Sequence, residues 1–219
     1  MKEVGENFST TGPENHGFSS LNSVSWNLNQ QEIYEIILER GEGKLSKDGA
    51  MVVETGIHTG RSAQDKFVVK ESANKDDIWW ENAKEMSEEN FNTLYKDMTD
   101  FSINKDLFVQ DLYGGADLQY RLPTRIYTEY AWHSLFIQNL LITVKDEEKS
   151  AFDPEFIIID LPSFKADPNR HGSRSETIIA VNFAKKVVLI AGTSYAGEIK
   201  KSVFTMLNFL WPPKNVMPM

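Results

Sequence analysis

The stretch VVLIAGTSYAGEIKKSVFTMLNFL, residues 187–210, combines a strand-like run, a turn of small residues and an amphipathic helix. Residues 187–190 are β-branched or leucine and have the length of a buried strand. From about Gly197 onwards, apolar residues recur with the 3.6-residue period of a helix that packs one face on a core, at Ile199, Val203, Met206, Leu207 and Leu210. Pro212 and Pro213 then end the helix. A strand followed directly by a core-packed helix indicates an α/β fold.

Further apolar runs extend this pattern in both directions along the chain. Short strands are predicted at residues 51–53, 67–69, 107–109, 156–159 and 178–181, the first two as buried strands. Several strands interleaved with helices indicate the α/β class, but the crossovers are too irregular for a doubly wound sheet. We therefore predict a mixed β-sheet flanked by helices.

Three further helical segments separate these strands. Asn29 followed by Glu32 has the form of a capping box, and Gly41 is a helix stop. A mostly buried helix is predicted from Thr128 to about residue 141. Residues 76–98 show a weaker helical pattern, in which we expect Trp79 and Trp80 to be core anchors.

The first 20 residues differ in composition from the rest of the chain. They are rich in Gly, Ser, Thr, Asn and Pro and have no apolar period. We expect residues 1–20 to form a flexible N-terminal arm or a loosely docked strap, and residues 21–219 to form one domain.

Composition excludes several classes of function. The 219 residues carry a formal charge of −9, and they include no cysteine. The acidic balance argues against a nucleic-acid partner, and disulfides, zinc ribbons and thiol nucleophiles are excluded. No apolar run approaches the roughly 20 residues of a membrane span, and the polar N-terminus does not resemble a signal peptide. We therefore expect a cytoplasmic protein with no membrane partner.

The sequence lacks the common nucleotide-binding and metal-binding motifs. No GxGxxG is present, and the segment Gly41–Leu45 lacks both the first glycine and the Ser/Thr of a phosphate-binding P-loop. The four histidines have no metal-ligand spacing.

One loop that is a candidate for ligand binding or catalysis lies between two predicted strands, with the sequence TGIHTGRSAQDK at residues 55–66. Two glycines allow the backbone to approach a ligand closely. Arg61 presents a planar fork suited to a carboxylate or phosphate. Spacing alone favours the alternative, a structural loop in which Arg61 pairs with Asp65.

The second such segment is the turn GTSYAGEIKK at residues 192–201. Lys200 and Lys201 lie in the first turn of the predicted helix, where the helix dipole is already positive. Positive potential collected at one point suits the binding of an anion or the lowering of a lysine pKa. A solvated pair of surface lysines, offset by Glu198, is an equally good interpretation.

These two segments resemble motifs of the ATP-dependent phosphoenolpyruvate carboxykinases. HTGRS at residues 58–62 with DKF at 65–67 is similar to the substrate loop of that family, and residues 192–201 are similar to its Gly-Thr-x-Tyr-x-Gly-Glu-x-Lys-Lys signature. Between them, Arg121, Arg125 and the segments at 128–129 and 131–132 follow in the family's order. The resemblance runs from about residue 25 to the end of the chain.

The resemblance implies both a fold and a reaction. The fold would be that of the family's N-terminal domain, and the reaction converts oxaloacetate and ATP into phosphoenolpyruvate, ADP and carbon dioxide, a step of gluconeogenesis. It implies that Arg61 contacts the substrate carboxylate and the departing carbon dioxide, and that Tyr195 lines the substrate site. Lys201 would be a ligand of Mn²⁺ or Mg²⁺ that also approaches the substrate and the γ-phosphate of ATP. Lys200 would lie beside it as a further catalytic residue that faces the phosphates. We expect structural roles for Arg121 and Arg125.

The chain also departs from the family pattern. Family members commonly have other residues at five positions, namely Ala63, Gln64, Ala191, Ser194 and Ala196. The family's metal-binding His and Asp, its P-loop and its adenine pocket would follow residue 219, so we expect a substrate-side domain that is inactive without a nucleotide-binding C-terminal domain. A non-catalytic carboxylate- or anion-binding module and a truncated fragment are the alternatives.

Overall fold

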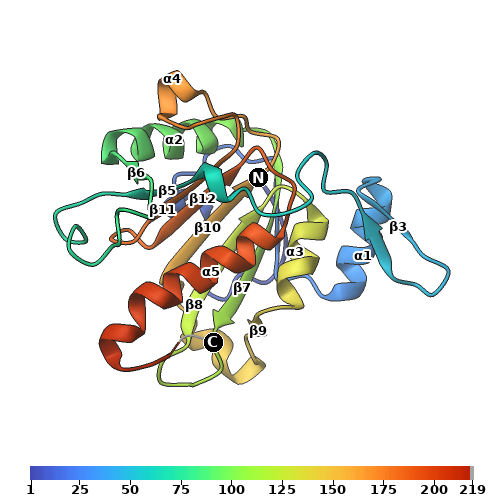
Figure 1. Ribbon diagram of the computed structural model, residues 1–219. Helices are drawn as coiled ribbons and strands as arrows, with labels where there is room; N and C mark the ends of the chain where they lie inside the picture. The colour runs from blue at the N-terminus through green and yellow to red at the C-terminus, as the bar shows by residue number, and fades with distance from the viewer. Residues whose placement is uncertain (218–219) are drawn as a thin grey trace.

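The computed structural model describes residues 1–217 and is built on a ten-stranded mixed sheet (Figure 1). The strand order is β1-β2-β7-β8-β10-β12-β11-β5-β6, with β9 beside β7. The strands are β1 (Lys2–Gly5), β2 (Ser23–Trp26), β5 (Lys66–Val69), β6 (Glu85–Met86), β7 (Asp106–Gly114), β8 (Leu122–Thr128), β9 (Ile142–Thr143), β10 (Phe156–Leu161), β11 (Ile178–Asn182) and β12 (Val187–Ala191). The predicted mixed α/β sheet is confirmed.

The middle of the sheet is formed by β8, β10 and β12, which run parallel to one another. Antiparallel pairs join β8 to β7 and β12 to β11. Every residue of β10 is buried, which explains why its sequence is a nearly continuous apolar run. The carboxyl ends of three neighbouring strands therefore meet at one edge of the sheet.

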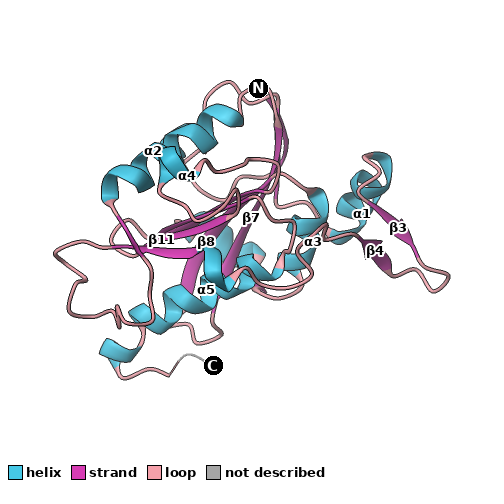
Figure 2. Cartoon of the chain, turned by 45° about the horizontal axis from the view of Figure 1, so that its top comes forward, coloured by secondary structure: helices cyan, strands magenta, loops and turns pink. Residues whose placement is uncertain are grey.

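Helices cover both faces of the sheet, with α2 and α4 on one side and α5 on the other (Figure 2). The helices are α1 (Gln30–Glu39), α2 (Glu88–Phe101), α3 (Ala131–Gln138), α4 (Pro168–His171) and α5 (Gly197–Leu210). Side chains of β10 alternate between the faces, as strand geometry requires, so that Ile157 and Ile159 join the core under α2. Phe156 and Ile158 join the core under α5. No helix within residues 1–217 is long and apolar enough to cross a membrane.

The local signals for α1 and α5 are confirmed. The Asn29 side chain accepts a hydrogen bond from the Glu32 backbone N–H, and the Glu32 carboxylate accepts one from the Asn29 backbone N–H. In α5 the predicted stripe is buried from Ile199 to Leu207. The helix predicted from Thr128 is shorter than expected, because α3 begins at Ala131.

Two predictions in the first half of the chain are wrong. Residues 76–84 contain no helix, and Trp79 is 69% exposed, so it is not a core anchor. The helical pattern there belongs to α2, which begins only after Ser87 caps it. The run at 51–53 does form β4 (Met51–Val53), but this strand pairs only with β3 (Gly43–Leu45) in a separate hairpin and leaves Val52 55% exposed.

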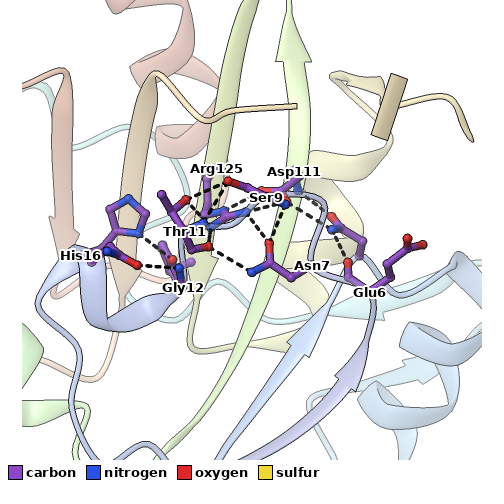
Figure 3. Close-up of polar contacts among 11 residues, drawn as sticks. Glu6, Asn7, Ser9, Thr11, Gly12, His16, Asp111 and Arg125 are labelled. Atoms are coloured by element: carbon purple, nitrogen blue, oxygen red, sulfur yellow. Dashed lines mark hydrogen bonds and ion pairs between the residues drawn. The ribbon is translucent and has the colours of Figure 1, made fainter. Parts of the chain in front are cut away.

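The N-terminal segment, for which composition predicts a flexible arm or a loosely docked strap, is docked on the sheet. Strand β1 pairs in parallel with β2, and the residues that follow cross over a buried arginine (Figure 3). Arg125 is fully buried and binds both carboxylate oxygens of Asp111, at 2.7 and 2.9 Å. Its remaining N–H groups donate to the Thr11 carbonyl at 2.7 Å and the Asn7 side chain at 2.8 Å. The polar composition of this segment thus supplies acceptors to a buried guanidinium, which supports the structural role expected for Arg125.

Candidate active site

The turn between β12 and α5 depends on two glycines. Gly192 has a φ of +73°, and a Cβ there would lie 2.3 Å from the Glu176 carbonyl oxygen. A Cβ at Gly197 would lie 2.5 Å from the ring of Tyr195, which packs across the start of the helix. The Tyr195 backbone N–H donates to the Thr193 hydroxyl at 3.1 Å. Only glycine therefore allows this turn to place the half-buried Tyr195 ring against the first turn of α5.

The arginine loop is attached to this turn by a buried hydrogen bond. The Ser62 backbone N–H donates to a carboxylate oxygen of Glu198 at 2.6 Å. His58 adds a second connection, because one ring nitrogen contacts the Thr177 hydroxyl at 3.0 Å and the other contacts the Ser62 hydroxyl at 3.1 Å. Thr177 in turn donates to the Gly192 carbonyl. The two segments singled out in the sequence, about 130 residues apart, therefore meet in space.

Arg61 projects from the loop without a partner among residues 1–217. Its side chain is exposed, and it makes no hydrogen bond or ion pair with the described residues. The alternative in which it pairs with Asp65 is wrong, because Asp65 is bound by both N–H arms of Arg174 at 3.0 Å and by the Ser175 hydroxyl. The Arg61 guanidinium thus remains available to an external anion.

Lys201 and Lys200 differ although they are neighbours. Lys201 is half-buried, with its amine 4.3 Å from the centre of the Phe204 ring. Burial lowers the pKa of Lys201, and the charges of Arg61 and Lys200 lower it further. Lys200 is exposed to solvent. The lowered pKa predicted for Lys201 has the expected direction, with burial as its largest cause.

Sequence reasoning missed a fourth cation, Lys66 at the start of β5. Its amine donates to the Thr205 hydroxyl on α5 at 2.7 Å, and it shares with Lys201 the lining of a cavity of about 440 Å³. Burial lowers the pKa of Lys66 to about 8, aided by the charges of Lys201 and Arg61. A lysine opening a buried strand directly after the arginine loop was the signal in the sequence.

A single buried carboxylate lies among these cations. Burial raises the pKa of Glu198, although the Ser62 N–H and the charges of Lys66 and Arg61 act in the opposite direction. Asp77, which is exposed, also lines the cavity shared by Lys66 and Lys201. Two carboxylates cannot neutralise three cations, and Glu198 already accepts the hydrogen bond that closes the loop. The cluster of Arg61, Lys66 and Lys201, which we call the cation cluster, therefore keeps a positive potential that favours an anion.

The cation cluster does not by itself form a metal site. Within residues 1–217 no group of three His, Asp or Glu side chains is placed to hold a metal ion. A lysine amine can donate a lone pair only when neutral, and the lowered pKa of Lys201 is compatible with that role. One amine supplies a single ligand, so an ion bound here would need further ligands besides Lys201.

The comparison with protein families decides what this site belongs to. A family model described as phosphoenolpyruvate carboxykinase matches residues 22–219, which include both the arginine loop and the turn before α5. The chain belongs to the ATP-dependent phosphoenolpyruvate carboxykinase family. The resemblance carried by residues 58–67 and 192–201 is thereby confirmed.

Curated relatives of this phosphoenolpyruvate carboxykinase family match the whole chain. Proteins named phosphoenolpyruvate carboxykinase (ATP) from Parvibaculum lavamentivorans, a Methylobacterium species and Mesorhizobium japonicum are 57%, 54% and 53% identical to it. Each alignment covers 100% of this chain and 41% of the relative. The chain thus spans about two fifths of the length of the carboxykinases that it matches.

Proposed function

We propose that this chain supplies the substrate side of the active site of an ATP-dependent phosphoenolpyruvate carboxykinase. The proposed reaction converts oxaloacetate and ATP into phosphoenolpyruvate, ADP and carbon dioxide in the cytoplasm. Residues 21–219 would form the substrate-side domain, working with a nucleotide-binding P-loop domain that supplies the phosphate cradle. The chain alone is expected to show no turnover.

The observation that carries this proposal is the unneutralised cation cluster at the junction of the arginine loop and α5. Arg61 has no partner among residues 1–217, and Asp65 is occupied by Arg174. The substrates of the proposed reaction are small carboxylate and phosphate anions. A guanidinium fork suits a planar carboxylate, and clustered amines suit phosphate oxygens.

Each residue of the site has a proposed role. Arg61 would hold and orient the carboxylate that leaves as carbon dioxide, because a bidentate contact fixes its plane. Tyr195, braced against Gly197, would line the same substrate site. Lys200 and Lys201 would face the transferring phosphoryl group, where fixed positive charge stabilises the charge that develops.

A divalent ion, Mn²⁺ or Mg²⁺, and ATP are the proposed cofactors. When bound, the ion neutralises phosphate charge and polarises the reacting oxygens. In this chain only Lys201 is proposed as a ligand, through its neutral amine. ATP would be held mainly by the nucleotide-binding domain.

Calorimetric titration of the 219-residue chain with phosphoenolpyruvate and with oxaloacetate tests the substrate assignment. We expect saturable binding that weakens as salt is raised, because the cluster acts through charge. Succinate, a dianion without phosphate, is the matched ligand control. Absence of binding by both substrates would contradict the assignment.

A chimaera tests the reaction itself. Residues 1–219 would replace the corresponding segment of the Parvibaculum relative, to which they are 57% identical over their full length. We expect the chimaera to form phosphoenolpyruvate from oxaloacetate and ATP in the presence of Mn²⁺, whereas the chain alone forms none.

Lys201→Arg in the chimaera tests the proposed metal ligand. We expect loss of Mn²⁺-dependent activity although the positive charge is kept, because a guanidinium neither deprotonates nor donates a lone pair. Lys200→Arg is the matched control and should remain active. Equal Mn²⁺ affinity in wild type and Lys201→Arg would remove Lys201 from the site.

A further inference from the structure

A buried histidine–aspartate pair lies at the carboxyl edge of the three parallel central strands. Asp160 is near the end of β10, where it pairs in register with Thr128 of β8 and Ile190 of β12. His133 stands in the first turn of α3, which follows β8. Both side chains are buried, with at most 1% of either exposed. Nothing in the proposed reaction uses them.

The pair is connected directly to the turn that carries Tyr195. His133 Nδ1 lies 2.5 Å from Asp160 Oδ2, and His133 Nε2 lies 3.0 Å from the backbone carbonyl oxygen of Ser194. Ser194 is the residue before Tyr195, within the turn between β12 and α5. The imidazole thus connects the central strand β10 to the turn between β12 and α5.

The two contacts determine where the protons are. A carbonyl oxygen only accepts hydrogen bonds, so His133 Nε2 must carry a proton. A second proton lies between Nδ1 and the Asp160 carboxyl group. Asp160 therefore orients the ring, in the way that a carboxylate behind a histidine holds it in other sites. The other carboxyl oxygen, Asp160 Oδ1, is buried and has no partner among residues 1–217.

Aromatic packing keeps the imidazole in this position. The Trp132 ring lies edge-on to it with the ring centres 4.0 Å apart, and the Tyr130 ring lies 5.4 Å away. A side chain packed on two sides and hydrogen-bonded at both nitrogens would lose these contacts in any other rotamer. The packing therefore restricts the position of the Nε2 donor relative to the Ser194 carbonyl oxygen.

A second histidine–aspartate pair in the chain shows what a purely local role looks like. His171 of α4 lies 2.9 Å from Asp97 of α2, and Arg170 binds the same carboxylate. The bond to Arg170, with that to His171, lowers the pKa of Asp97 to about 2. These residues join two helices at one face and contact neither the turn nor the cation cluster.

We propose that His133 is a positioning residue of the active site, which acts by donating from Nε2 to the Ser194 carbonyl. Asp160 sets the orientation of the ring, and the ring fixes the turn that places Tyr195 and the first turn of α5 against the arginine loop. The expected effect of His133 on substrate binding rests on the proposed function. Its expected effect on the geometry of the turn does not.

Two substitutions at His133 separate its two hydrogen bonds. His133→Gln places an amide N–H near the position of Nε2, so it keeps the donor to Ser194 and loses the bond to Asp160. His133→Asn places its amide near Nδ1 and does the reverse. We expect Gln to bind phosphoenolpyruvate within threefold of wild type and Asn to bind at least tenfold more weakly, by calorimetry on the 219-residue chain. His171→Asn is the matched control and should leave affinity unchanged.

Two further measurements on the same proteins do not depend on substrate. The ¹⁵N resonances of the wild-type His133 ring should show a proton on Nε2 at neutral pH. Amide hydrogen exchange at Tyr195 should be at least tenfold faster in His133→Asn than in His133→Gln, and circular dichroism confirms that each variant is folded. A variant that does not fold is replaced by Asp160→Leu, which removes the bond that orients the ring, and exchange at Tyr195 should then be at least tenfold faster than in wild type.

The outcomes distinguish this proposal from the proposed function. If wild type binds no phosphoenolpyruvate but exchange at Tyr195 follows the expected order, the proposed function fails and the positioning role stands. An unprotonated Nε2, or equal exchange and equal affinity in the Asn and Gln variants, would overturn the positioning role.

Discussion

Arg125 and the cation cluster are two sites of positive charge that differ in how fully the chain pairs them. Arg125 is fully buried, and it is bound by Asp111, Thr11 and Asn7 with its guanidinium 4.8 Å from the centre of the Trp26 ring. Each of the three guanidinium nitrogens donates to an oxygen of the chain. Taking a charge out of water is costly unless it is paired and hydrogen-bonded, so burial requires this full set of partners.

The cation cluster has no such set. Arg61 has no partner within residues 1–217, Lys66 donates only to a hydroxyl, and Lys201 rests on an aromatic ring. The pKa values of both lysines are lowered because their charges are neither fully hydrated nor neutralised. The difference teaches how to separate structural from functional cations here. A charge whose partners lie within the chain serves the fold, and a half-buried charge without them is arranged for a ligand.

Removing Arg125 should have the largest effect on folding. Arg125→Met leaves Asp111 buried without its partner, and breaking a buried pair on one side costs about 3–5 kcal/mol of unfolding free energy. Urea denaturation measures this loss. Lys96→Met, which breaks the exposed pair with Asp100, is the control and should cost under about 0.5 kcal/mol. A double variant Arg125→Met with Asp111→Leu should recover part of the loss, and no recovery would argue against an unpaired charge as its cause.

Removing Arg61 should give the reverse result. Arg61→Gln should weaken phosphoenolpyruvate binding by about 10–100-fold, because charge-assisted hydrogen bonds to a ligand are worth roughly 1.5–3 kcal/mol. Its unfolding free energy should change by less than about 1 kcal/mol, since an exposed side chain without a partner contributes little. Calorimetry and urea denaturation of the same preparation test both statements. A variant that loses stability but keeps affinity would place Arg61 with Arg125 as a structural cation.

The pH dependence of stability should report on Lys66. Its pKa is about 8 in the folded protein and near 10.5 when unfolded, so between these values the unfolded chain binds more protons. Stability should therefore rise with pH above 8, by on the order of 1–2 kcal/mol up to pH 9.5. Lys66→Met should remove most of this rise, and Lys201, whose pKa is also lowered, contributes the rest. The range stops at pH 9.5 because Tyr95 and Tyr127, whose pKa values are raised by burial, reduce stability once unfolded tyrosine ionises.

Lys200 should show the smallest effect in the substrate-free chain. It is exposed and has no partner within residues 1–217, so Lys200→Gln should change unfolding free energy by under about 0.5 kcal/mol. Phosphoenolpyruvate affinity should fall less than threefold, and Lys201→Gln, measured beside it, should fall further. Equal losses for the two lysines would mean that the half-burial of Lys201 does not matter for anion binding.

Much of the fold was predictable because it depends on local pattern. The strand runs at 156–159, 178–181 and 187–190 and the stripe of α5 reflect the periodicities of buried strands and amphipathic helices. The failures occur where burial is decided elsewhere. Trp79 is a core residue by type, yet it is 69% exposed. Strand β4 is apolar, but within residues 1–217 it pairs only with β3, in a separate hairpin.

For the candidate site, the sequence indicated the residues but not their partners. Arg61, Tyr195, Lys200 and Lys201 stand in recognisable strings, and local helix electrostatics already suggested a lowered pKa for Lys201. Lys66 was missed because its role depends on a hydroxyl 139 residues away, at Thr205.

By itself, the sequence determined the class of fold, the limits of α1 and α5, and membership of the carboxykinase family, because short-range periodicity, caps and distinctive strings carry that information. Tertiary structure alone decided which charges are paired. Because Asp65 is bound by Arg174, Arg61 has no partner within residues 1–217, and the bond from Ser62 to Glu198 joins the loop to the helix. The physical reason is that the energy of a charge depends on burial and on atoms within a few ångströms, which strand order and register bring together from distant parts of the chain.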